Sequence, residues 1–272
     1  MPVHDRMEPF ATGPHYGPVL DPMLIKIVNA PVKINPLISP PVEEGPEQPY
    51  LKWDMLFETS FVQRSDEPAH QSWMNGRGAP ATFPRLSSLR LITTQIPWMI
   101  DVVARDLERG VTCEEVIEAI AHNLGKSSSN SDYACLHRHD QAELSHAYRY
   151  NRSPNPGVPG GRLKEAMKRL DYLRTNTSFG GIVVDDRTVK RLCGSELPCV
   201  FVLKCNKRFM SQKDVQEHET RMRRAAGGTS RAASKGPPSA RSRGHSPNGM
   251  ITVHPPSSSS YTTDSDEGGV DR

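Results

Sequence analysis

The sequence has no long apolar run, few aromatic residues and few cysteines. Of its 272 residues, 36% are hydrophobic, 6% are aromatic and five are cysteines. Every apolar run is far shorter than the roughly 20 residues that span a bilayer, and the Pro-rich first thirty residues resemble neither a secretory signal nor a transit peptide. Five widely spaced cysteines suggest reduced thiols rather than a disulfide framework. The sequence therefore predicts an intracellular protein, cytoplasmic or nuclear, that makes no membrane contact.

Residues that can form a core are concentrated in the middle of the chain. Residues 50–210 hold all three Trp and every Phe except Phe10. Before them, residues 1–49 contain eleven prolines, and after them 22 of residues 227–272 are Gly, Pro or Ser. Such segments bury too little apolar surface to offset the entropy of ordering them. We therefore expect a disordered Pro-rich segment 1–31, one globular domain 32–210, and a disordered tail 211–272.

The clearest local signal is a helix that follows Thr112. Thr112 and Glu115 have the spacing of a capping box, in which each side chain bonds the other residue's backbone. Apolar residues then recur at helical spacing, and Gly125 stands where a left-handed residue would end the helix. The pattern predicts a helix over residues 113–124.

Strand and helix signals alternate through the rest of the middle region. A second helix is expected from Ser131, Asp140 resembles a further cap, and residues 153–161 read as a loop. Gly180 and Gly181 are expected to mark a bulge or a close backbone approach. The runs typical of β-strands are residues 86–94, 98–103, 170–173, 179–184 and 199–205. This order predicts an α/β or α+β class, with one small mixed sheet and two to four helices.

Several of these pieces resemble an uncharacterised fungal (basidiomycete-type) domain family of unknown function. Together they cover about residues 32–210. They are Asn35-Pro36-Leu37-Ile38, Leu51-Lys52-Trp53-Asp54, residues 89–92, Pro97-Trp98, Gly110-Val111-Thr112, residues 116–120, Ala147-Tyr148 with Arg152, residues 170–173 and residues 179–182. The resemblance implies a small α/β fold and a fungal source. It implies no catalytic residue, because none is established for the family.

Two groups of potential metal ligands are weak on geometric grounds. Cys135, His137 and His139 alternate, so on a helix neighbours two apart point about 200° apart. Cys199 and Cys205 would lie on one strand face about 20 Å apart, too far to share a metal or form a disulfide. The Gly-rich stretches lack the spacing of a phosphate-binding loop. We therefore expect no metal and no cofactor, and interpret Cys193, Cys199 and Cys205 as small core groups.

Three carboxylates stand inside apolar runs and are the candidate catalytic residues. They are Asp54, Asp101 and Asp171. Carboxylates can perform acid–base chemistry when burial separates their pKa values, although a structural role for each is the commoner explanation.

The tail changes the sign of its charge along its length. Residues 211–263 carry eight basic and three acidic side chains, whereas residues 264–272 carry four acids and one Arg. The basic part could contact polyanions weakly, without sequence specificity. Ser246, which precedes a proline, and Thr263 and Ser265, which lie among acids, are candidate phosphorylation sites.

The function favoured by these observations is non-catalytic. The chain is expected to bind or scaffold a protein partner, with tails that can be modified. One alternative is a hydrolase-like enzyme whose site assembles from distant Asp and His residues. The other is weak nucleic-acid association through the basic tail. A pocket that gathers the candidate carboxylates would favour the enzyme, whereas an open sheet edge would favour the binding domain.

Overall fold

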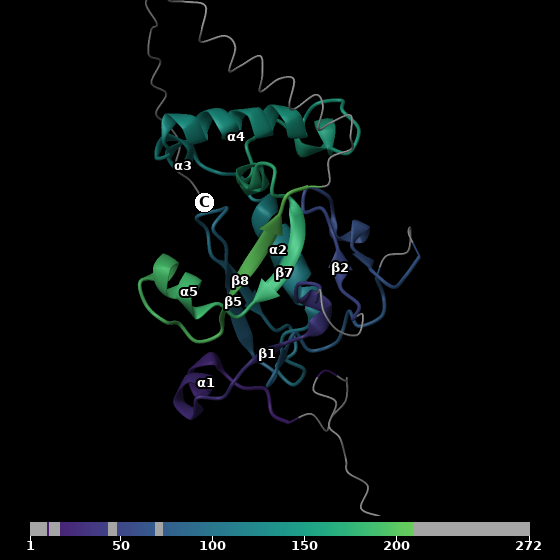
Figure 1. The fold of residues 1–272 in the computed structure, drawn as a ribbon, viewed down its shortest axis with the longest axis vertical. Helices are drawn as coiled ribbons and strands as arrows, with labels where there is room; N and C mark the ends of the chain where they lie inside the picture. Colours follow the sequence, from purple (N-terminus) through teal and green to yellow (C-terminus); the bar gives the residue numbers. More distant parts are fainter. Residues whose placement is uncertain (1–9, 11–16, 43–47, 69–72, 209–272) are drawn as a thin grey trace, which may run out of the picture. The chain divides into compact units, whose positions relative to one another are not determined.

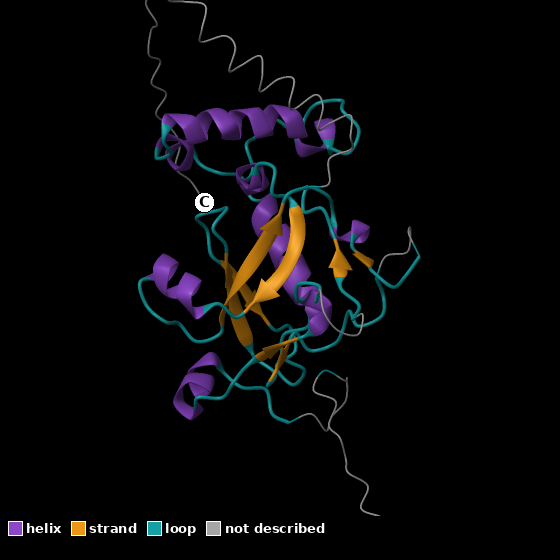
Figure 2. Ribbon diagram, in the orientation of Figure 1, coloured by secondary structure: helices purple, strands orange, loops and turns teal. Residues whose placement is uncertain are grey.

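A four-stranded mixed sheet lies at the centre of the protein. A computed structural model describes residue 10 and residues 17–42, 48–68 and 73–208. The sheet has the order β6-β5-β8-β7, and its parallel pair, β5 and β8, is flanked by two antiparallel pairs (Figure 1). Its strands are β5 (Ser88–Ile92), β6 (Ile100–Val103), β7 (Ser178–Val183) and β8 (Val200–Asn206). Helices surround this sheet (Figure 2), which confirms the predicted α+β class.

Helix α2 (Cys113–Gly125) covers one face of the sheet, and in Figure 1 it lies behind the strands. The predicted capping box is present: Thr112 N–H donates to Glu115 Oε2 at 2.8 Å, and Glu115 N–H donates to Thr112 Oγ1 at 3.3 Å. Gly125 differs from the expectation, because it is the last helical residue and Lys126 follows with φ −66°. The chain leaves the helix extended because Ser127 pairs at once with Lys168.

The two faces of the sheet bury different side chains. On the α2 side, Ile100 and Val102 of β6 belong to the main core with Ile117 and Ile120 of α2. On the other side, helix α5 (Asp186–Cys193) packs Val189 against a small group of strand residues. This group is Ile92, Val200 and Val202. Strand β8 is therefore buried on both faces over its first four residues, as expected for a central strand.

The described residues contain five α-helices, more than the two to four expected. Besides α2 and α5 they are α1 (Pro22–Val28), α3 (Asn130–Ala134) and α4 (Arg138–Asn151). Helix α1 lies within residues 1–31, where the sequence predicts disorder. It forms because Asp21 caps Met23 N–H at 2.8 Å and Pro22 stands at the first helical position. Among the described residues no helix has the length and apolar content to cross a membrane.

Helix α4 begins earlier than the sequence pattern indicates. His137 is its N-cap, so Asp140 belongs to the first turn and does not cap a helix of its own. Acidic residues are favourable both at the cap and in the first turn, because both places face the free N–H groups of the helix end. Leu144 and Ala147 are buried, as the apolar stripe predicts. In Figure 1, α4 runs across one end of the main sheet.

The predicted strand over residues 170–173 is wrong. These residues form the 3₁₀ helix η4 (Arg169–Leu173). Asp171 accepts a hydrogen bond from Lys168 N–H at 2.9 Å, and such a local bond closes a turn where an extended chain would need a neighbouring strand. The loop expected over 153–161 likewise ends in a 3₁₀ helix, η3 (Gly160–Leu163).

Two short strand pairs and two 3₁₀ helices complete the fold. Strand β2 (Leu51–Lys52) pairs with β3 (Gln63–Arg64), and β1 (Lys33–Ile34) pairs with β4 (Thr82–Phe83). The remaining 3₁₀ helices are η1 (Pro36–Ile38) and η2 (Thr59–Phe61). The register between β7 and β8 shifts between Phe179 and Ile182, which confirms the bulge predicted at Gly180 and Gly181. A Cβ on Gly181, which has φ +86°, would lie 2.4 Å from the nitrogen of Pro40, so only glycine permits this close approach.

Candidate binding groove

A groove of about 670 Å³ lies between the outer strand β6 and helix α2. We call it the β6–α2 groove. Its walls are residues 99–103, Arg105, Lys126, Arg169 and, from α2, Glu115, Glu118, Ala119, His122 and Asn123. Of the three candidate carboxylates, only Asp101 borders it, together with His122. The groove therefore does not gather the carboxylates that an acid–base site would need.

Two residues of β6 direct their backbone N–H and C=O groups away from β5, toward the outside of the sheet. Ala104 N–H donates to Ser87 O at 2.9 Å, whereas Arg90 N–H donates to Cys199 O at 3.0 Å on the opposite side of β5. Since hydrogen bonding alternates along an antiparallel pair, Asp101, which faces Arg90, turns its own N–H and C=O outward, and so does Val103. Among the described residues, nothing hydrogen-bonds to these outward backbone groups.

The acidic side chains of the groove all have cationic or backbone partners. Glu115 accepts from Arg105 N–H at 2.7 Å as well as from Thr112. Glu118 forms ion pairs with Arg105 and Arg77. Asp101 pairs with Arg90 across the strands at 2.9 Å. None of these carboxylates is therefore free to neutralise the positive charge of the basic residues at the other end of the groove.

The opposite end of the groove is basic. It is formed by His122, Lys126 and Arg169, next to Met99 at the start of β6. Arg169 Nη1 donates to Asn123 Oδ1 at 3.1 Å, and the guanidinium lies 4.6 Å from the centre of the Trp98 ring. Asn123 Nδ2 in turn donates to Met99 O at 3.3 Å. Arg169 is thus held at a defined place beside the edge strand.

Asp54 lies at the other edge of the sheet, where it forms a β-bridge with Ser178, the first residue of β7. Its Oδ1 accepts from Leu56 N–H at 3.1 Å. Burial raises the pKa of Asp54, against smaller opposing effects of the Leu56 hydrogen bond, the Thr177 hydroxyl and the charge of Arg208. Three strand spacings separate the two edges, roughly 14 Å, so Asp54 cannot act together with Asp101.

Asp171 is fully buried and holds the turn η4 against α4. Its carboxylate accepts from Arg152 Nη1 and Nη2 at 3.0 and 3.2 Å, Asn151 Nδ2 at 2.9 Å, and Lys168 N–H. Arg152 also stacks on Tyr148, with 3.9 Å between its guanidinium carbon and the ring centre. With both oxygens occupied by fixed donors, this carboxylate has a structural role.

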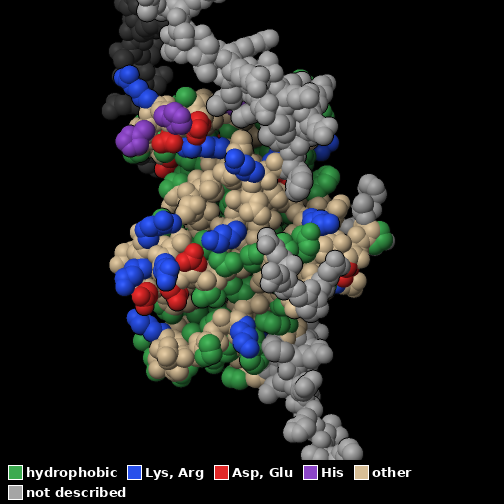
Figure 3. Space-filling model, viewed as in Figure 1, with side chains coloured by type: hydrophobic (Ala, Val, Ile, Leu, Met, Phe, Trp, Pro, Cys, Tyr) green, Lys and Arg blue, Asp and Glu red, His purple; other side chains and the backbone are tan. Residues whose placement is uncertain are grey.

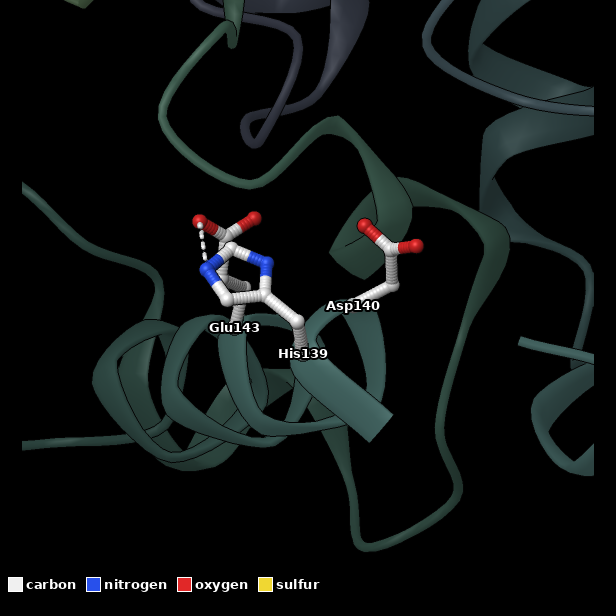
Figure 4. A group of neighbouring side chains, drawn as sticks. All are labelled: His139, Asp140 and Glu143. Atoms are coloured by element: carbon white, nitrogen blue, oxygen red, sulfur yellow. Dashed lines mark ion pairs between the residues drawn. The ribbon is translucent and has the colours of Figure 1, made fainter. Parts of the chain in front are cut away.

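On α4, Glu143 joins His139 and Asp140, which belong to the densest group of potential ligands in the sequence. In Figure 3, histidine side chains lie beside acidic ones over α3 and α4. His139, Asp140 and Glu143 each bring a ligand atom within 4.8 Å of the others, and Figure 4 shows Asp140 to one side of the His139–Glu143 pair. Arg174 already contacts both acids, Asp140 at 2.8 Å and Glu143 at 2.5 Å. A guanidinium thus neutralises the carboxylates that a metal ion would require.

Burial perturbs three thiols: Cys113 and Cys199 are buried, and Cys205 is partly buried. Burial raises the pKa of Cys199 and of Cys205 to about 11, and it raises the pKa of Cys113 further. A thiol that stays protonated at neutral pH is a poor nucleophile. Cys135 is exposed, at the end of α3.

Two sets of residues complete the outcome of the sequence predictions. Ser246, Thr263 and Ser265 lie outside the described residues, and their phosphorylation stays a prediction. Conversely, the sequence analysis did not identify Lys126 and Arg169 as binding residues. They are 43 residues apart in the sequence, and no local motif connects them.

Comparison with known proteins identifies the family. No curated protein and no solved structure matches the chain. The model of a family of unknown function, DUF6699, matches residues 51–191, which run from β2 into α5 and include both walls of the β6–α2 groove. The match covers more than half of the 272 residues. The chain therefore belongs to the family of unknown function DUF6699.

Proposed function

We propose that this protein is a protein-interaction domain that binds an extended segment of a partner by strand addition to β6. The observation that carries the proposal is the outward backbone of Asp101 and Val103, which opens onto the β6–α2 groove. An extended peptide can continue the sheet at such an edge, while its alternate side chains enter the groove.

The backbone hydrogen bonds of strand addition supply only part of the binding free energy. The N–H and C=O groups of Asp101 and Val103 offer up to four hydrogen bonds, each worth roughly 0.5–1.5 kcal/mol net. Their sum, roughly 2–6 kcal/mol, corresponds to dissociation constants from roughly tens of millimolar to tens of micromolar. Useful affinity and any specificity must therefore come from side chains of the peptide in the groove.

The arrangement of the candidate carboxylates supports binding over hydrolysis. Asp54 and Asp101 lie at opposite edges of the sheet, and Asp171 is saturated by Arg152, Asn151 and Lys168. Nucleic-acid association through residues 211–263, a fungal origin, an intracellular location and domain limits at residues 31 and 210 are predictions that rest on the sequence.

The test exploits the alternation of hydrogen bonds along β6. A library of short random peptides is selected on the full chain, and binding of the enriched peptides is measured by fluorescence anisotropy. Val103→Pro removes one outward N–H without removing a bond to β5, and proline is tolerated on edge strands. Val103→Thr is the matched control. We expect Val103→Pro to weaken binding about tenfold or more, and Val103→Thr to bind like the parent.

Amide hydrogen exchange gives a second readout on the same strand. In the free chain the amide hydrogens of Asp101 and Val103 should exchange quickly and that of Val102 slowly. Of these three amides, only that of Val102 donates to β5. A bound peptide should protect Asp101 and Val103. Failure to enrich any peptide, or peptides that bind Val103→Pro unchanged and leave both amides unprotected, would refute strand addition.

A further inference from the structure

The charges of the β6–α2 groove are balanced at one end and unbalanced at the other. Glu115, Glu118 and Asp101 all have partners, as described above. Lys126 and Arg169 form no ion pair within the described residues. We propose that this basic end is a subsite for an acidic side chain, Asp or Glu, of the peptide that adds to β6. This inference rests on the proposed function.

Arg169 is positioned before any ligand arrives. Trp98 supports one face of the guanidinium, and Asn123 accepts from Nη1. Because Asn123 also donates to Met99 O, the guanidinium is linked to the first residues of β6. Trp98 is itself fixed by an edge contact with Tyr172, with ring centres 4.7 Å apart. A side chain held in this way loses little conformational entropy when it binds an anion.

Asp132, whose pKa Arg169 helps to lower, already has hydrogen-bond partners. Arg169 is among the smaller causes that lower the pKa of Asp132, after its hydrogen bonds with Ser129. Asp132 accepts from Ser129 N–H and from Ser129 Oγ, both at 2.8 Å. That carboxylate caps α3 and comes within ion-pair distance of neither Arg169 nor Lys126. The positive charge beside Met99 therefore remains available to a ligand.

The free donors at this end of the groove can hold a carboxylate. Arg169 Nη1 is bonded to Asn123, and Arg169 Nε is buried without a partner. Arg169 Nη2, with two N–H groups, and Lys126 Nζ, with three, remain for the two oxygens of a carboxylate. A phosphate would present three acceptor oxygens to the same donors, so phosphoserine is included in the test.

The experiment is a comparison of peptide preferences between charge variants of the full chain. The random library is selected in parallel on the parent and on Lys126→Glu, and the enriched peptides are sequenced. Lys33→Glu is the matched control, because Lys33 is exposed on β1 and lies outside the groove. We expect Asp or Glu at one position of the parent's peptides. Replacing that acid by Gln or Asn should weaken binding roughly five- to tenfold.

The variants then show whether the basic end of the groove recognises the acidic residue of the peptide. Lys126→Glu should lose the preference for an acid at that position or select Lys or Arg there, whereas Lys33→Glu should keep the parent's preference. Peptides that depend on the β6 backbone but show no acidic position, or an acidic position unchanged in Lys126→Glu, would overturn the subsite and leave strand addition intact. Binding tightened more than about tenfold when phosphoserine replaces the selected acid would overturn the assignment to a carboxylate.

Discussion

The two edges of the main sheet differ in how their backbone groups are satisfied. At the β7 edge, Phe179 N–H donates to Trp53 O and Met55 N–H donates to Thr177 O, each at 2.8 Å. Residues 53–55 thereby pair with residues 177–179 at the beginning of this edge, and Trp53 packs near Phe179 with ring centres 6.1 Å apart. At the β6 edge, the outward groups of Asp101 and Val103 meet no described segment. One edge is thus part of the fold, and the other is open to a partner.

The open edge carries features that limit unspecific pairing. Strand β6 has four residues, and its outer face bears the exposed Asp101–Arg90 pair. Short strands and charges at an edge are common means by which proteins avoid edge-to-edge aggregation. The comparison of the two edges teaches that the backbone of β6 is open, while its shortness and its charges limit pairing with other strands. A partner must therefore complement the groove as well as the backbone.

The largest effect is expected at the covered edge. Trp53 is 3% exposed, and its Nε1 donates to Phe57 O at 3.0 Å. Trp53→Ala should lower the free energy of unfolding by about 3–5 kcal/mol, because it leaves a cavity beneath the residues that cover β7. Urea denaturation followed by circular dichroism measures it. A loss below about 1 kcal/mol would mean that this cover is not integral to the fold.

A smaller effect is expected from the charge of Asp54, at the same edge. Because burial raises its pKa in the folded protein, the folded state binds a proton more readily than the unfolded chain. The parent should therefore gain stability as the pH falls through the folded pKa toward the usual value of 3.8, and lose it as the pH rises. The amide of Asp54→Asn does not titrate, so this variant lacks the pH-dependent contribution of Asp54 to stability.

The measurement is the difference in unfolding free energy between Asp54→Asn and the parent. At neutral pH the variant avoids the cost of a buried charge, and its advantage should shrink as the pH falls toward 4, roughly the unfolded pKa of an Asp. A pH-independent difference would contradict the assignment of burial as the main cause. Glu108→Gln, at an exposed residue, controls for general charge effects.

The smallest effect on stability is expected at the open edge. Asp101 and Arg90 are both largely exposed, so their ion pair is screened by solvent. Asp101→Thr should change the free energy of unfolding by less than about 1 kcal/mol. A loss as large as that of Trp53→Ala would show that β6 is a stabilised edge and would remove the contrast between the two edges.

Local patterns were readable wherever a few neighbouring residues satisfy one another. The Thr112–Glu115 capping box and the Gly180–Gly181 bulge were predicted and are present. The prediction failed at residues 170–173, where apolar composition suggested a strand. The turn there depends in part on Arg152, which is distant in sequence, so composition alone could not reveal it.

The sequence by itself determined the α+β class, the helix after Thr112 and a strand within residues 98–103, which the structure narrows to Ile100–Val103. Capping and hydrophobic alternation act over a few residues and leave a local signature. Only the tertiary structure decided that β6 is an outer strand, that Asp54 and Asp101 stand at opposite edges, and that Lys126 and Arg169 meet beside Met99. Strand order and the approach of distant side chains follow from how the whole core packs, and no local stretch of residues encodes that outcome.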